Sequence, residues 1–127
     1  MKTRFNPRSP LIVIRARLFG PVGDVSFKLA IDTGSTWTLI DPDSLLAAGY
    51  DLARPAGRMT LATGKGLVNA PIVAGVTLAT LGRRSVGVRV CAHALPPHAG
   101  VDGVLGLDFL RQGRLVIDFV AGTIDFD

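Results

Sequence analysis

The chain has 127 residues, enough for one domain that buries about two-thirds of the surface of its unfolded chain. Hydrophobic residues make up 48% and charged residues 19%, which excludes a disordered chain. A formal charge of +4 could indicate a nucleic-acid partner, but the basic residues are scattered along the sequence apart from Arg83 and Arg84. We therefore expect a solvated basic surface and no nucleic-acid partner, with weak attraction of an acidic partner as the alternative.

The cysteine and histidine residues do not form a recognisable metal or redox motif. The single cysteine, Cys91, excludes an internal disulfide, and the strand pattern around it favours a core position. His93 and His98 flank a Pro-Pro pair and have no third ligand nearby, so we expect a surface loop there. The sequence predicts neither a metal site nor a cofactor.

The N-terminus shows no basic start followed by an uninterrupted apolar segment, so no secretory signal is visible. The apolar stretches are too broken to span a bilayer. We expect a soluble protein without a membrane segment, cytoplasmic by default.

The sequence predicts an irregular or edge segment over residues 1–10 and a single domain over residues 11–127. Residues 11–19 form an apolar strand, a Gly-Pro turn follows, and residues 25–31 alternate as the returning strand. This strand leads directly into Asp32.

Asp32 starts the tight turn Asp32-Thr33-Gly34-Ser35. Gly34 permits backbone geometry that other residues resist, and Thr33 and Ser35 place hydroxyls beside the carboxylate. All four residue types also favour ordinary turns, so a plain hairpin turn explains the stretch equally well on its own.

Residues 37–40 resume apolar character, and helix punctuation follows. Asp41 suits an N-cap, Pro42 the first helical position, and Gly49 the position after the last turn. The sequence thus predicts a short helix between Asp41 and Gly49.

The sequence predicts four more strands in the middle of the chain. Residues 58–62 and 67–70 flank Thr63-Gly64-Lys65-Gly66 as a hairpin with a flexible tip, which is too short for a phosphate-binding loop. Residues 72–81 and 85–91 read as two further strands. From these residues alone, an ordinary surface hairpin is the simplest interpretation of the tip.

A second stretch, Val104-Leu105-Gly106 followed by a short helix, lies towards the other end. The closing segments 115–119 and 122–126 read as a hairpin. Together with Asp32-Thr33-Gly34-Ser35, they resemble the retropepsin-like aspartic proteases, the single-lobe relatives of the pepsins. The resemblance extends from about residue 11 to residue 126.

This resemblance implies an all-β fold, a partly open acid-protease barrel with one lobe per chain. We expect eight or nine short strands and one or two short helices. Terminal segments that include Ile124 to Asp127 would pair across a dimer, as in the retroviral relatives.

The resemblance also implies residue roles. Asp32 would be the catalytic residue, Thr33 would brace two active-site loops, and Gly34 would let the backbone approach substrate. Ser35 would donate its hydroxyl to Asp32, stabilise the ionised form and favour activity at acidic pH. The scaffold packed behind the loop would be Val104, Leu105 and Gly106. The substrate flap would comprise Leu61, Ala62, Thr63, Gly64, Lys65 and Gly66, without the aromatic residue that pepsins carry near the tip.

Peptide-bond hydrolysis by carboxylates needs one group to accept a proton and another to donate one. This chain has one Asp-Thr-Gly, so a homodimer would supply the second Asp32. Its substrate would be a peptide or protein, bound by apolar residues such as Leu61, Ile72, Val104 and Leu105.

Two alternatives belong to other functional classes. One is a catalytically weak or inactive retropepsin-fold module that binds peptides or dimerises. The other is a basic nucleic-acid-associated β-barrel with a coincidental Asp-Thr-Gly.

Overall fold

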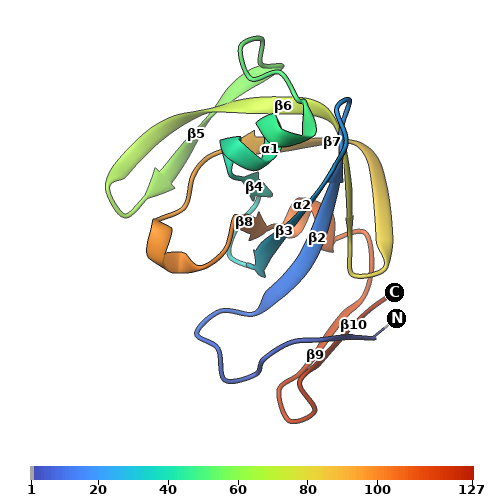
Figure 1. The fold of residues 1–127 in the computed structure, drawn as a ribbon. Coiled ribbons are helices and arrows are strands. Elements are labelled where there is room, and N and C mark those ends of the chain that lie inside the picture. Colours follow the sequence, from blue (N-terminus) through green and yellow to red (C-terminus); the bar gives the residue numbers. More distant parts are fainter. Residues whose placement is uncertain (1) are drawn as a thin grey trace.

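Ten strands, two short α-helices and one 3-10 helix form within residues 2–127, the part of the chain that the computed structural model describes (Figure 1). The strands are β1 (Lys2–Arg4), β2 (Val13–Phe19), β3 (Asp24–Ile31), β4 (Leu39–Ile40), β5 (Gly57–Thr63), β6 (Gly66–Thr80), β7 (Arg83–Ala92), β8 (Gly103–Leu105), β9 (Leu115–Asp118) and β10 (Thr123–Phe126). The helices are α1 (Pro42–Ala48), η1 (Pro97–Ala99) and α2 (Leu107–Leu110). The predicted all-β class is confirmed, with one strand more than the upper expectation of nine. Two of the ten strands are very short, since β1 spans three residues and β4 spans two.

Six strands form the barrel in the order β2, β3, β8, β4, β7, β6. An additional antiparallel pairing joins β2 to β6, from Ala16 opposite Thr80 to Phe19 opposite Thr77. The ring therefore closes on itself instead of remaining partly open, which removes most exposed strand edges. Strand β5 lies outside the ring and pairs with β6 alone.

The chain ends form a separate three-stranded sheet, in the order β1, β10, β9, which lies at one end of the molecule (Figure 1). Because β10 is the middle strand, both of its edges are already paired within the chain. The expectation that Ile124 to Asp127 pairs across a dimer is therefore wrong. The segment 1–10 contributes an edge strand through Lys2–Arg4.

One hydrophobic core fills the barrel and reaches the terminal sheet. In β2, Ile14, Ala16 and Leu18 are buried whereas Arg15 and Arg17 are exposed, as period-two alternation requires. Burial of each large apolar side chain stabilises the fold by about 1.5–3 kcal/mol. The largest fully buried side chains include Leu18, Leu29, Ile40, Leu45, Leu78, Leu105 and Ile124.

Helix α1 confirms its predicted boundaries. The Asp41 side chain accepts a hydrogen bond from the backbone N–H of Asp43, and Pro42 occupies the first turn. Gly49 ends the helix in the left-handed conformation with a φ of 95°. No helix within residues 2–127 is long and apolar enough to cross a membrane.

The predicted strands at residues 67–70 and 72–81 are one continuous strand, β6, of 15 residues. Pro71, which lies between the two predicted strands, pairs only with Arg58 of β5, and pairing with β7 begins at Ile72. A proline, which lacks an N–H donor, is tolerated where a strand has a neighbour on one side only.

Candidate active site

Asp32 follows directly after β3, and the turn around it holds its carboxylate in place. Its backbone N–H donates to the carbonyl of Leu105 (3.0 Å), which attaches the turn to β8. Its Oδ1 accepts from the N–H of Gly34 (2.9 Å), and its carbonyl accepts from the N–H of Ser35 (3.1 Å). The side chain is half-buried, and its Oδ2 has no hydrogen-bond partner within residues 2–127. One carboxylate oxygen thus remains available to a ligand.

The hydroxyl of Ser35 does not donate to Asp32. It donates instead to the carbonyl of Trp37 (2.7 Å), two residues further along the turn. The expected Ser35–Asp32 bond is therefore wrong, because a closer carbonyl takes the hydroxyl. Thr33 and Gly34 are exposed beside Asp32 at the outer edge of the loop.

The segment that follows β8 holds the loop from behind through backbone donors. The N–H of Gly106 donates to Oγ1 of Thr38 (3.1 Å), and the N–H of Leu107 donates to the carbonyl of Ser35 (2.8 Å). A Cβ at Gly106 would lie 2.5 Å from the Trp37 carbonyl oxygen, closer than real contacts allow. Only glycine permits this approach.

Val104 and Leu105 lie in β8, between β3 and β4. Leu105 is completely buried, whereas Val104 is half-buried. The expectation that Leu105 lines a substrate pocket is therefore wrong, since no ligand can reach it.

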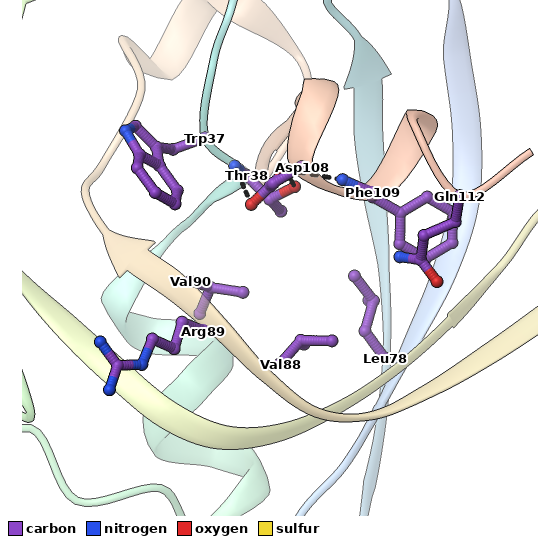
Figure 2. A pocket seen from close by; sticks show the side chains of 9 residues that line it. All are labelled: Trp37, Thr38, Leu78, Val88, Arg89, Val90, Asp108, Phe109 and Gln112. Atoms are coloured by element: carbon purple, nitrogen blue, oxygen red, sulfur yellow. Dashed lines mark hydrogen bonds between the residues drawn. The ribbon is translucent and has the colours of Figure 1, made fainter.

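Asp108 and Thr38 form a polar network that the sequence did not reveal (Figure 2). The Thr38 hydroxyl donates to Oδ1 of Asp108 (2.7 Å), and the Thr38 N–H donates to Oδ2 (3.1 Å). The Asp108 N–H donates to the carbonyl of Thr36 (3.2 Å). Thr38 is only 2% exposed, so the network is largely shielded from water. It connects α2 directly to the loop that carries Asp32.

A cavity of about 210 Å³ lies on the inner side of this network (Figure 2). Asp32 does not line it, so it lies behind the loop and not beside the exposed carboxylate. Its lining residues are Trp37, Thr38, Leu78, Val88, Arg89, Val90, Asp108, Phe109 and Gln112.

The predicted hairpin forms from β5 and β6 and extends to one side of the barrel (Figure 1). At its tip, the Thr63 hydroxyl donates to the Gly66 carbonyl (2.8 Å) and accepts from the Lys65 N–H (3.2 Å). Gly66 adopts a positive φ of 106°. Ala62, Gly64, Lys65 and Gly66 are exposed, and Leu61 and Thr63 are half-buried.

Next to this tip, Leu67 is 75% exposed. An apolar side chain at this level of exposure is available to contact a ligand. Leu67 lies in the predicted flanking strand, and its position beside a glycine-rich tip is the sequence signal that indicates a contact role.

Cys91 confirms its predicted core position and supports the same loop. Its backbone N–H donates to the Thr38 carbonyl (3.0 Å), and its thiol contacts the Met59 sulfur at 3.6 Å. Burial, with a further contribution from the Asp108 charge, raises the pKa of the Cys91 thiol. The thiol therefore stays protonated and does not act as a nucleophile. No group of three or more His, Cys, Asp or Glu residues suited to a metal occurs in the described chain, 2–127.

We predict that Asp108→Asn lowers the free energy of unfolding by about 1–3 kcal/mol, because an amide cannot accept from both donors of Thr38. Urea denaturation measures the change. Asp43→Asn removes a carboxylate from an exposed position and is the matched control. Equal stabilities of the two variants would contradict the role of the network.

We also predict that the protein loses stability above about pH 9 through Cys91. The folded state holds the thiol proton more tightly than the unfolded state does, so this contribution is complete below the unfolded-state pKa and is lost as pH rises through the folded-state pKa. Thermal unfolding between about pH 7 and 11 measures it. Cys91→Ala should flatten the alkaline decline, and an unchanged slope would contradict the prediction.

Comparisons with known proteins agree with this geometry. The family described as gag-polyprotein putative aspartyl protease matches residues 20–112. The fold is similar to that of a retropepsin-like aspartic protease from Rickettsia conorii, with a TM-score of 0.70 and 17% sequence identity. That match covers 99% of this chain and 88% of the other. No curated protein matches the sequence. Since the family match spans most of the chain, the protein belongs to the gag-polyprotein putative aspartyl protease family.

Proposed function

We propose that two copies of this chain form an aspartic endopeptidase. The observation that carries the proposal is Asp32, a half-exposed carboxylate with one free oxygen, on a loop fixed from behind by β8 and α2. Catalysis requires that the reacting group be held in a fixed orientation, and a loop anchored in this way provides it. The family and the fold support protease activity for a site of this composition.

The mechanism needs a second carboxylate next to the first. In the proposed dimer, Asp32 of each copy faces the other across a two-fold axis, and the two share one proton, because like charges so close cannot both ionise easily. One carboxylate accepts a proton from water, and the other donates one to the carbonyl oxygen of the scissile peptide bond. Water attacks the carbonyl carbon and forms a tetrahedral intermediate. The proton taken from water then passes to the amide nitrogen, the C–N bond breaks, the amine leaves and the other product is a carboxylic acid.

The exposed residues beside Asp32 suit this arrangement. Thr33 would hydrogen-bond the opposite loop across the axis, and Gly34 would allow the substrate backbone to approach. The catalytic unit would be the single domain of residues 11–127, with 1–10 attached through the pairing of β1 with β10.

The β5–β6 hairpin would act as a flap over the substrate. Within residues 2–127, the side-chain hydrogen bonds at its tip are the local ones of Thr63, and a methyl group on Gly64 or Gly66 would meet no neighbouring atom within 4 Å. Such a tip can move while the strands keep it aimed. With no aromatic residue between residues 61 and 67, Leu67 would supply the apolar contact to substrate side chains.

Cleavage of casein between about pH 3 and 7 tests the proposal, with wild type, Asp32→Asn and a transition-state-mimicking inhibitor of aspartic proteases. We expect cleavage by the wild type that both the inhibitor and Asp32→Asn abolish. Activity should also rise faster than linearly with protein concentration, because only the dimer carries two carboxylates.

The alternative, a peptide-binding module without turnover, is favoured by the missing aromatic residue at the flap tip. It requires a folded, dimeric wild type that cleaves nothing at any pH tested. Peptide binding that survives Asp32→Asn would then replace the endopeptidase proposal.

The flap role gives a separate prediction. Gly66→Ala strains the hairpin, because a side chain disfavours its positive φ, whereas Gly64→Ala adds a methyl group in open space. We expect Gly66→Ala to reduce kcat/KM by about tenfold, with Gly64→Ala close to wild type. Steady-state kinetics on a peptide substrate measures both, and identical values for the two variants would exclude the flap role.

A further inference from the structure

Six basic side chains that are scattered in the sequence gather along two adjoining depressions of the surface. The depressions have volumes of about 440 and 550 Å³ and share Arg15 and Gly82. The sequence suggested that the basic residues do not cluster, but folding brings them together. The basic groove, as we call the two depressions, carries Arg4, Arg15, Arg17, Lys28, Arg83 and Arg84.

Strand register explains this clustering. Arg15 of β2 lies directly opposite Lys28 of β3. Two residues further along β2, Arg17 lies opposite Ala79 of β6, which in turn lies opposite Arg84 of β7. Rows of the sheet therefore place cations from three strands on one outer face, over small side chains such as Ala79.

The charge of the molecule is concentrated in this groove. It holds six of the 14 Lys and Arg residues, and Asp24 is the acidic residue paired there, with Arg17 at 3.0 Å. Outside the groove the sequence has 8 basic residues and 9 Asp residues, so the positive charges there are balanced. Arg83 donates to the carbonyl of Gln112 (3.1 Å), whereas Arg15 has no ion-pair partner within residues 2–127.

The clustered positive charges lower the stability of the folded protein. Like charges directly opposite on neighbouring strands, as in Arg15 and Lys28, destabilise a sheet. Within residues 2–127 neither Arg15 nor Lys28 forms a side-chain ion pair, although the Asp102 carboxylate accepts a hydrogen bond from the backbone N–H of Lys28 (2.9 Å). An anionic partner would offset the repulsion.

We propose that the basic groove binds an extended, acidic segment of a partner protein. Arg15 and Arg17 are two residues apart on one strand, so their side chains repeat at about 6.6–6.8 Å. Alternate side chains of an extended peptide have the same repeat, so carboxylates at every second position would meet successive guanidinium groups. Guanidinium groups bind carboxylates through paired hydrogen bonds, which makes arginine well suited to this contact.

A nucleic acid fits the groove less well, because no aromatic face is free for base stacking. Phe19 carries the guanidinium of Arg84 at 4.3 Å and that of Arg17 at 5.3 Å from its ring centroid. Phe5, in the adjoining depression, is only 9% exposed.

The basic groove is distinct from the candidate active site. None of its lining residues belongs to the Asp32 turn or to the Thr38–Asp108 network, and β6 contributes only Ala79 and Thr80, which lie beyond its pairing with β5. The proposal therefore does not depend on catalysis, and an Asp32→Asn background can be used so that no peptide is cut.

Fluorescence anisotropy tests the proposal with a labelled decapeptide of alternating Glu and Thr. A Lys-Thr decapeptide and single- and double-stranded oligonucleotides of similar charge are titrated in parallel. We expect binding of the acidic peptide that weakens as salt is raised. The double variant Arg15→Gln/Arg84→Gln should bind about tenfold more weakly or worse. The matched control, Arg54→Gln/Arg111→Gln, removes the same charge from exposed positions outside the groove and should change affinity less than about twofold.

Three results would overturn the proposal: no binding of the acidic peptide, equal weakening by both double variants, or tighter binding of an oligonucleotide than of the acidic peptide. The melting temperature of Arg15→Gln gives an independent check. It should equal or exceed that of the wild type, because the substitution relieves repulsion with Lys28. A clear decrease would mean that Arg15 stabilises the fold and would also overturn the proposal.

Discussion

The loop that carries Asp32 depends on the hydrogen bonds between Thr38 and Asp108, residues 70 positions apart in the sequence. Thr38 lies at the exit of the loop, and Asp108 lies in α2. The hydroxyl of the same threonine accepts from the N–H of Gly106, and its backbone carbonyl accepts from the N–H of Cys91, so one buried residue joins the loop, α2 and β7. In a shielded network of this kind each bond strengthens the others, and losing one partner leaves buried groups unsatisfied. The network fixes the end of the loop, while Gly34 and Leu105 hold Asp32 itself.

A second constraint is the number of carboxylates. The fixed loop presents one Asp32, whereas the proposed chemistry needs two. The terminal sheet cannot complete a dimer through β10, since β1 and β9 already occupy both of its edges. In residues 2–127 the outer edges of this sheet are β1 and β9. In our account the second copy must approach through these edges or through the exposed loop around Thr33 and Gly34, and not by exchange of the C-terminal strand.

Local signals in the sequence predicted local structure well. Helix α1 was readable because Asp41, Pro42 and Gly49 act within a few residues, and the β5–β6 hairpin because its turn residues are contiguous. Contacts between segments that are distant in the sequence could not be predicted from it. The Asp108–Thr38 network, the closure of the barrel by β2 and β6, and the clustering of Arg15, Lys28 and Arg84 all depend on strand order and register. The prediction for the Ser35 hydroxyl was wrong because the Asp32 carboxylate and the Trp37 carbonyl are both possible acceptors close to it in the sequence. Only the folded geometry selects the Trp37 carbonyl.

The central claim, that catalysis uses one Asp32 from each of two copies, is tested most directly by mixing subunits. Wild type at fixed concentration is equilibrated with about a tenfold excess of Asp32→Asn, and peptide cleavage is followed. If the dyad spans a dimer, most wild-type chains pair with inactive ones, so activity per wild-type chain falls to about one-tenth of the value without the variant. Activity that does not change as the variant is added would show that a single chain cleaves alone and would contradict the account.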